Sequence, residues 1–377
     1  MPLRVAVVTE SFLPSLNGVT NSVVRVLESL KADGHDALVL APTSNSAEFL
    51  GFKVIRISRF YVKQFAVALP HLRLEAILRE FNPDVVHVAA PFAFGRQAIR
   101  VAHRMGVPAI AIYQTDIAGY AQRYGLPGLR PIIDRMIGAI HRRATVNLAP
   151  TAEGADYLRK IGAKGVAVWG RGVDLEAYNP QKRELVASTG YRKRLGAHDH
   201  IIVGFVGRLA AEKQVERLAE LFGIPNVSFL IVGDGPEREN LKKLFRYQKV
   251  EFTGRLVGPE LANAYASMDI FVHCGTEETF GQTIQEAQAS GLPVVAPARG
   301  GPRFIIRSGH NGFLVNPDEP NAYRQVVIEL INNPELRKTI GSNARTGVID
   351  KSWSSNNAQL FDHYLNAIKI KNEDRVA

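Results

Sequence analysis

Short apolar runs alternate with longer stretches of helical periodicity along the first 178 residues. Continuous apolar runs separated by helices are typical of a parallel sheet that is covered on both faces. The pattern therefore predicts a doubly wound α/β domain. The predicted strands are RVAVVTE (4–10), DALVLAP (36–42), FKVIRIS (52–58), DVVHVAA (84–90), PAIAIYQ (108–114), TVNLAPT (145–151) and VAVWGRG (166–172), and the clearest helices are 18–34 and 130–144.

The same pattern starts again after a polar interruption. Residues 179–199 are charged and have no long apolar run, which indicates a link between two domains. We therefore expect domains at 1–178 and 179–352, with one or two amphipathic helices from about Trp353. Two such domains would place a cleft between the carboxyl ends of their sheets. The second set of predicted strands is IIVGFVGR (201–208), VSFLIVGDG (227–235), VEFTGR (250–255), DIFVHCG (269–275), PVVAPA (293–298) and GFLVNP (312–317).

Composition agrees with an ordinary soluble protein of 377 residues, 46% hydrophobic and 22% charged. The only cysteine, Cys274, cannot form an internal disulfide, so we expect a reducing, cytoplasmic compartment. The start MPLRVAVVTESF resembles a strand rather than a signal peptide, and no apolar run is long enough to span a membrane.

The net charge of +10 is concentrated in the first domain, where 21 Lys and Arg face 14 Asp and Glu. Such a surface can meet nucleic acid, anionic lipid or an acidic substrate, or can simply be a solvated basic face. No nucleic-acid-binding motif accompanies it, so we expect no nucleic-acid partner.

Two segments can bind an anion, and each follows the first predicted strand of its domain. Arg208 and Lys213 in GFVGRLAAEKQ lie at the carboxyl end of a strand, where a guanidinium and an ammonium suit a diphosphate. Asn17–Gly18–Val19 is a turn that opens a helix and lets the backbone approach an anion. The chain lacks the GxGxxG and GxxxxGK[ST] motifs, which disfavours a dehydrogenase or a P-loop nucleotidase.

The segment EETFGQTIQEA (277–287) combines carboxylates with a helix that should begin near Thr279–Gly281. A helix N-terminus attracts phosphate, whereas the carboxylates of Glu278 and Glu286 would repel it and should instead accept hydrogen bonds from hydroxyl groups. A ligand with a sugar, a diphosphate and a ribose in sequence would satisfy this arrangement, and that ligand is a nucleotide sugar. Alternatively, Glu277 and Glu278 complement the helix dipole and Glu286 is exposed; for Glu277 this is the preferred interpretation.

Together, the E-x7-E element, GFVGR-x4-K, the GDGP turn and the NGV loop resemble retaining glycosyltransferases of family four, from residue 4 to the helix at Trp353–Tyr364. More narrowly, four longer segments resemble actinobacterial GDP-mannose-dependent α-mannosyltransferases. These segments are ESFLPSLNGVTNSVVRVLESL, YQTDIAGYAQRYG, WGRGVD and YASMDIFVHCGTEETFGQTIQEAQASGLPVVAP. Those enzymes mannosylate membrane glycolipids such as glucuronosyl diacylglycerol and precursors of lipomannan-like polymers.

The resemblance implies a GT-B fold of two Rossmann-like domains, with the helix at about 353–377 crossing back onto the acceptor-binding first domain. It implies that GDP-mannose is held mainly by the second domain, and that the acceptor is a glycolipid such as glucuronosyl diacylglycerol or a phosphatidylinositol mannoside. Carried over residue by residue, the resemblance implies that Arg208 and Lys213 hold the diphosphate, Glu286 the ribose and Glu278 the sugar. The backbone amides of Phe280, Gly281, Gln282 and Thr283 would face the sugar and phosphate. Arg255 and Leu256 would line the base, and Gly18 would close on the diphosphate from the first domain.

The chain departs from the family pattern in two places. Gln114, Thr115 and Asp116 stand where many relatives have a histidine near the sugar, so Asp116 is a candidate catalytic residue or a helix cap. The segment GGPRF lacks a glutamate that many relatives have, although Gly300, Gly301 and Arg303 remain candidates near the sugar or acceptor. His87, inside a predicted strand, is expected to be packed.

The expected mechanism is front-face substitution, in which Arg208 and Lys213 stabilise the leaving phosphate, with no required metal and at most a non-essential Mg²⁺. The expected location is the inner face of the plasma membrane, held there by basic and apolar residues within 59–80, although these apolar side chains can equally pack on the sheet. Alternative functions are a UDP-sugar transferase with a small soluble acceptor, a nucleotide-sugar epimerase, and a binding module for anionic lipid or nucleic acid.

Overall fold

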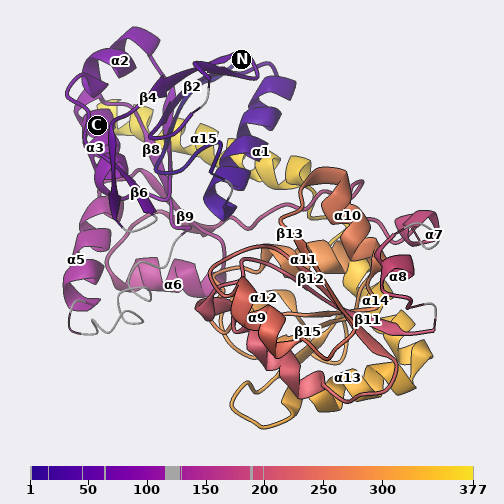
Figure 1. Ribbon diagram of the computed structural model, residues 1–377. Coiled ribbons are helices and arrows are strands. Elements are labelled where there is room, and N and C mark those ends of the chain that lie inside the picture. Colours follow the sequence, from indigo (N-terminus) through magenta and orange to yellow (C-terminus); the bar gives the residue numbers. More distant parts are fainter. Residues whose placement is uncertain are drawn as a thin grey trace. The chain divides into compact units, whose positions relative to one another are not determined.

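The computed structural model describes residues 2–15, 17–44, 46–62, 65–114, 128, 130–186, 190–197 and 199–376 (Figure 1). The chain forms two compact units. Unit 1 comprises Met1–Arg171 and Trp353–Ala377, and unit 2 comprises Gly172–Ser352. Each of the thirteen predicted apolar runs contains a strand.

Unit 1 is built on a sheet with the strand order β10-β9-β8-β7-β1-β2-β4-β3. All neighbouring strands pair in parallel except the edge strand β3, which is antiparallel to β4. The chain order reverses at β1, which pairs with both β2 and β7. The strands are β1 (Arg4–Thr9), β2 (Asp36–Ala41), β3 (Glu48–Phe49), β4 (Phe52–Arg56), β7 (Val85–Ala89), β8 (Ala109–Ile112), β9 (Val146–Ala149) and β10 (Val166–Val168).

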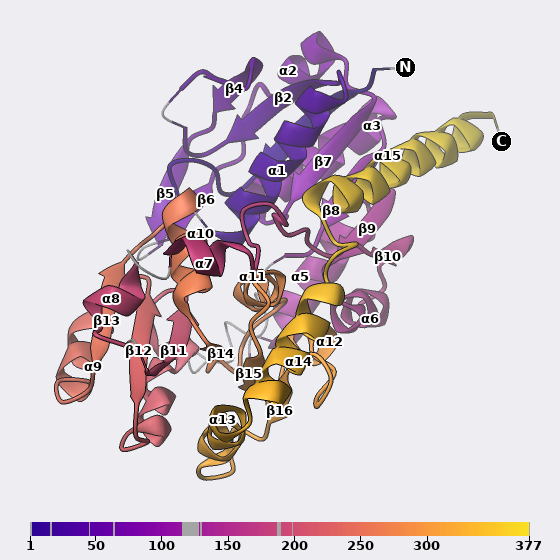
Figure 2. The same cartoon turned by 90° about the vertical axis from the view of Figure 1, so that its right-hand side faces the viewer.

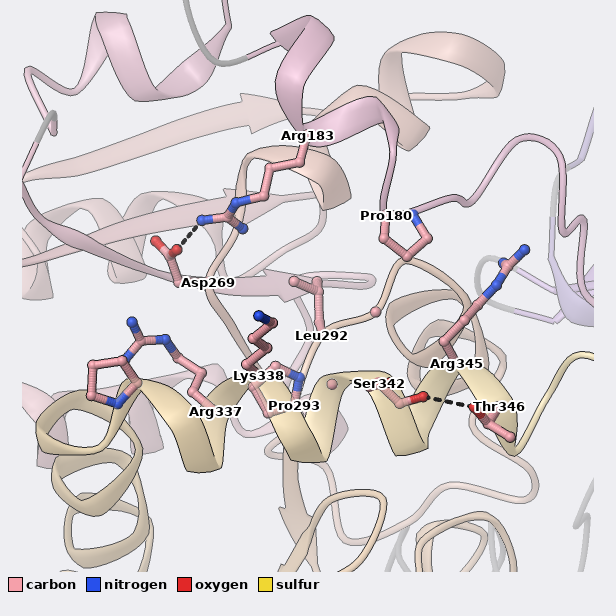
Figure 3. Close-up of a pocket in the computed structure, with 13 residues that line it drawn as sticks. Pro180, Arg183, Asp269, Leu292, Pro293, Arg337, Lys338, Ser342, Arg345 and Thr346 are labelled. Atoms are coloured by element: carbon pink, nitrogen blue, oxygen red, sulfur yellow. Dashed lines mark hydrogen bonds and ion pairs between the residues drawn. The ribbon is translucent and has the colours of Figure 1, made fainter.

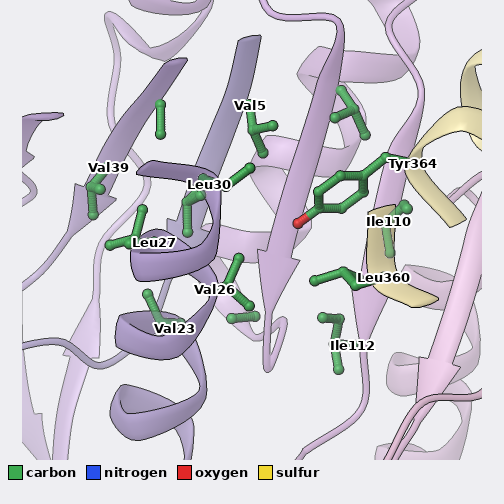
Figure 4. Close-up of a cluster of buried hydrophobic side chains, with 14 of the residues drawn as sticks. Val5, Val23, Val26, Leu27, Leu30, Val39, Ile110, Ile112, Leu360 and Tyr364 are labelled. Carbon is green, nitrogen blue, oxygen red and sulfur yellow. The ribbon is translucent and has the colours of Figure 1, made fainter. Parts of the chain in front are cut away.

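Helices cover both faces of this sheet because alternate strand residues point to opposite sides. One face packs on α1 (Gly18–Ala32) and on the C-terminal helix α15 (Trp353–Val376), a single helix that returns to unit 1 (Figure 4). The other face packs on α2 (Leu74–Phe81), α3 (Ala93–Met105) and α5 (Arg130–His141). A further helix, α6 (Ala152–Lys160), packs beside β9.

His87 is a packing residue of this core. Its Nδ1 lies 2.7 Å from the hydroxyl of Tyr364 on α15, and burial lowers the pKa of His87 to about 3. A neutral, enclosed imidazole contributes to attaching α15, as expected for a histidine inside a strand.

A two-stranded antiparallel hairpin, β5 (Arg59–Val62) and β6 (Phe65–Ala68), was not predicted from the sequence. The apolar residues of 59–80 divide between two environments. Leu74 and Leu78 are buried in the core, whereas Phe60, Leu69 and Leu72 are exposed. Lys63 lies outside the described residues.

Unit 2 contains a parallel six-stranded sheet with the order β13-β12-β11-β14-β15-β16 (Figure 2). One face packs on the 3₁₀ segment Val215–Leu221, on α9 (Arg238–Leu244) and on α13 (Ala322–Asn332); the other packs on α10 (Gly258–Ser267) and α11 (Gln282–Ala289). Its strands are β11 (Ile201–Val206), β12 (Val227–Val232), β13 (Val250–Gly254), β14 (Ile270–Val272), β15 (Val294–Pro297) and β16 (Phe313–Val315).

The boundary between the units differs from the expected position at 178, because residues 172–178 fold onto unit 2. Val173, Leu175 and Tyr178 pack beside Ala289 and Val348. Arg345 on α14 (Pro334–Thr346) donates hydrogen bonds to the carbonyl groups of Leu175, Tyr178 and Ala289.

The expected link at 179–199 is likewise part of unit 2. It forms the short helices α7 (Lys182–Val186) and α8 (Tyr191–Arg194). The buried carboxylate of Asp269 binds both Arg183 and Arg192, which attaches this segment at the start of β14. These charged residues appeared as a solvated linker because their common partner is distant in the sequence.

Arg183 and Asp269 line a groove of about 460 Å³ beside α14 (Figure 3). Asp269 immediately precedes β14, and Leu292 and Pro293 immediately precede β15, so the groove lies at the amino ends of these strands. Two of its arginines hold the 172–183 segment in place: Arg183 binds Asp269, and Arg345 donates to the carbonyl groups of Leu175 and Tyr178. The third, Arg337, donates to the carbonyl groups of Leu330 and Ile331.

Candidate functional site

The strand order of unit 2 reverses between β11 and β14, so the loops after these two strands lead in opposite directions. In doubly wound sheets, ligands bind in the crevice outside the carboxyl ends of the strands at such a point. Arg208 follows β11, and Glu278 follows β14 in the loop that leads to α11. Sequence order alone places Arg208 and Glu278 far apart, and the topology brings their loops together.

Lys213 and Glu278 form a direct ion pair. The Nζ of Lys213 lies 2.7 Å from Oε2 of Glu278, and the two side chains are 23% and 18% exposed. The other carboxylate oxygen accepts a hydrogen bond from the backbone N–H of Phe280 at 3.4 Å. Burial would raise the pKa of Glu278, but the charge of Lys213 outweighs it and the pKa falls to about 2. The carboxylate is therefore ionised throughout the neutral range.

His273 is a third member of this cluster that the sequence interpretation missed. Its Nε2 lies 4.0 Å from the same Glu278 oxygen, and its side chain is buried. Burial lowers the pKa of His273 to about 4, so the imidazole is neutral at pH 7. The cluster thus holds one ammonium, one carboxylate and one neutral imidazole.

Arg208 has a more open environment than Lys213. Its side chain is 38% exposed and lies 3.8 Å from Glu212, one turn along the loop. Because the contact to Glu212 is long and exposed, the Arg208 guanidinium can turn to an incoming anion at little cost.

The N-terminus of α11 is shaped by glycines. Gly281 precedes the helix with φ of +104°, a conformation that other residues rarely adopt. Gly300 and Gly301 pack directly against the preceding loop, since the N–H of Gly301 donates to the Glu278 carbonyl at 2.6 Å. A side chain on Gly301 would collide with the backbone of Phe280. The paired glycines thus support the Glu278–Gly281 backbone.

Glu286 is buried on α11, so the alternative expectation of an exposed Glu286 is wrong. It is 9% exposed, and its Oε2 accepts a hydrogen bond from the hydroxyl of Tyr265 at 2.9 Å. Tyr265 is fully buried on α10, and its single hydroxyl proton also faces the Thr283 carbonyl at a longer distance of 3.2 Å. Tyr265 was not recognised in the sequence, where it lies 21 residues before Glu286.

The other predicted donor residues of unit 2 lie in the loop before α11, on α11 itself and after β13. Gln282 directs its side-chain N–H to the carbonyl of Gly172, the first residue of unit 2, at 3.0 Å. Phe280 is buried, whereas Arg255 after β13 is exposed and Leu256 is half-buried. Thr283 offers its carbonyl to Tyr265.

In unit 1, Gly18 opens α1, and Asn17 caps this helix by accepting hydrogen bonds from the N–H groups of Val19 and Thr20 at 3.0 Å. The carbonyl of Gly18 accepts a hydrogen bond from Arg171 at 3.0 Å, and Arg171 also donates to the side-chain oxygen of Gln114 at 3.2 Å. Thr115 and Asp116 lie outside the described residues.

Comparison with known proteins identifies the family. Residues 16–177 match the model of Glycosyltransferase Family 4, and residues 189–347 match that of Glycosyl transferases group 1. The chain is 43% identical to a GDP-mannose-dependent alpha-mannosyltransferase of Corynebacterium glutamicum, across 98% of this chain and 90% of the relative. The protein belongs to glycosyltransferase family 4.

Further comparisons extend this assignment. The chain is 27% identical to an alpha-monoglucosyldiacylglycerol synthase of Acholeplasma laidlawii, across 91% of this chain and 92% of the relative. A sucrose-phosphate synthase from Thermosynechococcus elongatus superposes with a TM-score of 0.78 at 20% identity, covering 98% of this chain and all of that one. This last likeness concerns the fold alone, which is the GT-B fold that the sequence predicted.

The described residues of this family 4 glycosyltransferase include no group of three His, Cys, Asp or Glu side chains arranged to hold a metal ion. Within the same residues, no helix is both long and apolar enough to cross a membrane.

Proposed function

We propose that this glycosyltransferase moves an α-mannosyl group from GDP-mannose to a hydroxyl of a membrane glycolipid, with retention at the anomeric carbon. The observation that supports a nucleotide-sugar donor is the cluster at the switch point of unit 2. It combines Lys213, from the segment after β11, with the N-terminus of α11 and with the buried Glu286 on that helix. The name of the Corynebacterium relative supports mannose and guanine, and that of the Acholeplasma relative supports a glycolipid acceptor.

In this proposal the donor lies along α11. Its diphosphate contacts Arg208, Lys213 and the amides at Phe280–Thr283. Glu278 accepts hydrogen bonds from sugar hydroxyls, and Glu286, oriented by Tyr265, accepts them from the ribose. Arg255 and Leu256 line the base, while Gly18 and Asp116 act from unit 1 on the diphosphate and sugar, respectively.

The ion pair between Lys213 and Glu278 constrains how these roles operate. An ammonium at 2.7 Å offsets the charge of Glu278, so the carboxylate does not strongly repel an approaching phosphate. Lys213 has three N–H donors, and it can therefore serve Glu278 and a phosphate oxygen together. The pair acts as a neutral unit until the diphosphate arrives.

The proposed reaction is a front-face substitution. The acceptor oxygen forms a bond to the anomeric carbon on the face from which GDP leaves, and the bond to the β-phosphate breaks. The acceptor proton passes to a departing phosphate oxygen. Arg208, Lys213 and the α11 amides stabilise the charge on that phosphate, so the proposed reaction requires no metal, and removal of one such donor typically costs about 10²–10³ in turnover.

We also propose that unit 1 meets the anionic inner surface of the plasma membrane. On α3, the charge of Arg96, followed by burial and by the charges of Arg143 and Arg104, lowers the pKa of Arg100. Arg96 and Arg100 form no ion pair within the described part of the chain. Like charges on one helix face repel, and anionic lipid headgroups would relieve that repulsion. Exposed Phe60, Leu69 and Leu72 supply apolar contacts in the same unit.

A panel of nucleotides tests the donor. We expect GDP and GDP-mannose to raise the melting temperature more than UDP, ADP and their sugars, and Glu286→Ala to abolish the shift. Transfer is then measured with GDP-mannose and glucuronosyl diacylglycerol. A larger shift with UDP-glucose would favour the UDP-sugar alternative, and interconversion of the free donor without transfer would favour an epimerase.

A further inference from the structure

The carboxyl edge of the unit 1 sheet holds a small cluster of three residues, of which the donor roles above use only Gly18. Arg171 follows β10, Gln114 follows β8, and Gly18 opens the helix after β1. The side chains of Arg171 and Gln114 are only 8% and 6% exposed. Because the strands are parallel, their carboxyl ends share one edge of the sheet, which is where doubly wound domains bind ligands.

The backbone that presents Arg171 is held firmly. The N–H of Trp169 donates to the carbonyl of Ala149 on β9 at 2.8 Å, and the Trp169 indole donates to Asn356 on α15 at 2.9 Å. The side chain of Asn356 in turn donates to the carbonyl of Gly170 at 3.3 Å. Arg171 therefore projects from a fixed segment rather than from a free loop.

The guanidinium of Arg171 lies directly over Gly18. One of its terminal nitrogens donates to the Gly18 carbonyl at 3.0 Å, and a Cβ built on Gly18 would lie 2.6 Å from that nitrogen. The absence of a side chain at Gly18 thus admits the guanidinium. The other terminal nitrogen donates to Oε1 of Gln114 at 3.2 Å.

This last contact fixes the orientation of the Gln114 amide. A guanidinium has only donors, so the atom that faces Arg171 has to be the amide oxygen. The Nε2 of Gln114 is buried and has no hydrogen-bond partner within the described residues. A buried N–H₂ without a partner is costly, and a ligand oxygen would satisfy it.

We infer that Arg171 is a positioning residue that holds Gln114 with its amide N–H₂ directed at an oxygen of the nucleotide-sugar donor. The inference rests on the proposed function and extends it to two residues with separate tasks. Gln114 donates to a sugar hydroxyl or a phosphate oxygen, and Arg171 prevents the amide from turning its oxygen toward the ligand. Arg171 also fixes the Gly18 carbonyl, so that the turn opening α1 keeps its place.

A double-mutant cycle tests whether Arg171 acts through Gln114. The donor used is the nucleotide sugar with the largest thermal shift in the panel above, and kcat/KM and affinity are measured for the wild type, Arg171→Met, Gln114→Ala and the double variant. Each single change should lower kcat/KM for the donor about tenfold, the loss expected for one hydrogen bond to a buried polar group. The double variant should lose little more than either single variant, because the two residues act as one unit.

Three further variants separate positioning from folding. Gln114→Glu keeps an oxygen for Arg171 but removes the N–H₂, so it should match Gln114→Ala in kinetics at an unchanged melting temperature. Arg171→Lys keeps the charge but has one donor nitrogen in place of two terminal ones, so its kcat/KM should fall between those of wild type and Arg171→Met. Arg4→Met is the matched control, since Arg4 also donates to a carbonyl in unit 1, that of Phe81 at 2.6 Å, but at the opposite edge of the sheet.

Loss of affinity for the nucleotide sugar but not for GDP would assign the Gln114 contact to the sugar, and equal loss for both would assign it to the diphosphate. Wild-type kcat/KM in Arg171→Met, or fully multiplicative losses in the double variant, would overturn the inference. If Arg171→Met does not fold, a wild-type kcat/KM in Gln114→Glu would overturn the inference instead. If a nucleotide sugar other than GDP-mannose gives the largest rise in melting temperature, the proposed function is refuted but the inference about Arg171 and Gln114 is not.

Discussion

Replacement of Lys213 by methionine separates the structural and the catalytic contributions of one ammonium group. In the wild type, burial raises the pKa of Glu278, but Lys213, with smaller contributions from His273 and the N–H of Phe280, brings it from an ordinary 4.5 down to about 2. At about 1.4 kcal/mol per pKa unit this corresponds to about 3 kcal/mol of stability. Because the two side chains are 23% and 18% exposed, solvent screening reduces the expected loss to about 2 kcal/mol. For a unit of about 180 residues, the melting temperature should fall by about 4–8 °C.

The sign of the pH dependence follows from the depressed pKa of Glu278. The stabilisation is complete above the unfolded value near 4.5 and disappears as the pH falls through about 2. In Lys213→Met, burial raises the pKa of the same carboxyl group, which therefore takes up a proton more readily. The gap in melting temperature between wild type and variant should thus be larger at pH 7.5 than at pH 5.0.

The double variant Lys213→Met with Glu278→Gln gives opposite results for stability and activity. It removes the uncompensated carboxylate, so most of the lost stability should return, whereas turnover should stay about 10²–10³ below wild type because the phosphate-binding cation is absent. Melting curves by calorimetry and mannosyl transfer rates measure the two effects. The control is Lys242→Met, which breaks an exposed 2.9 Å pair with Glu239 and should leave the melting temperature unchanged. A Lys213→Met protein with wild-type stability at pH 7.5, or a double variant with restored turnover, would refute the reasoning.

Three other predictions concern separate parts of the molecule. Tyr265→Phe should raise KM for the donor about fivefold with little change in kcat, because Glu286 loses the hydroxyl that orients it; an unchanged KM would show that Glu286 needs no such support. Gly301→Ala should lower both melting temperature and turnover, since its Cβ would strike the backbone of Phe280. Gly128→Ala, where no atom of the described residues lies within 4 Å of the added Cβ, should change neither, and equal behaviour of the two variants would disprove the role given to Gly301. Arg100→Gln should weaken sedimentation with anionic vesicles about fivefold at low salt, and Lys242→Gln in unit 2 should not; identical sedimentation would exclude α3 from the membrane surface.

Local pattern was sufficient to predict the strands and the start of α11. Runs such as RVAVVTE and IIVGFVGR are buried on both faces, so their apolar composition marks them without knowledge of their neighbours. The hairpin at Arg59–Ala68 was missed because it has no such signal. The segment 179–199 was interpreted as a linker because its charged residues look solvated, yet Arg183 and Arg192 bind Asp269, which lies 86 and 77 residues away.

The candidate site shows the same division. The sequence indicated that Glu278, Glu286, Arg208 and Lys213 serve one ligand, because the type and local spacing of charged groups around a helix N-terminus restrict what can bind there. It could not indicate that Lys213 touches Glu278, since the pair spans 65 residues and depends on the reversal of strand order between β11 and β14.

The sequence by itself therefore determined most of the elements and the chemical class of the ligand, since periodicity, turns and helix caps act over a few residues. Only the tertiary structure decided the partners of the buried polar groups: Tyr265 for Glu286, and Arg171 for Gln114. The physical reason is that a buried charge or amide has to be satisfied by whatever group the topology brings within about 3 Å, and no local pattern in the chain specifies that group.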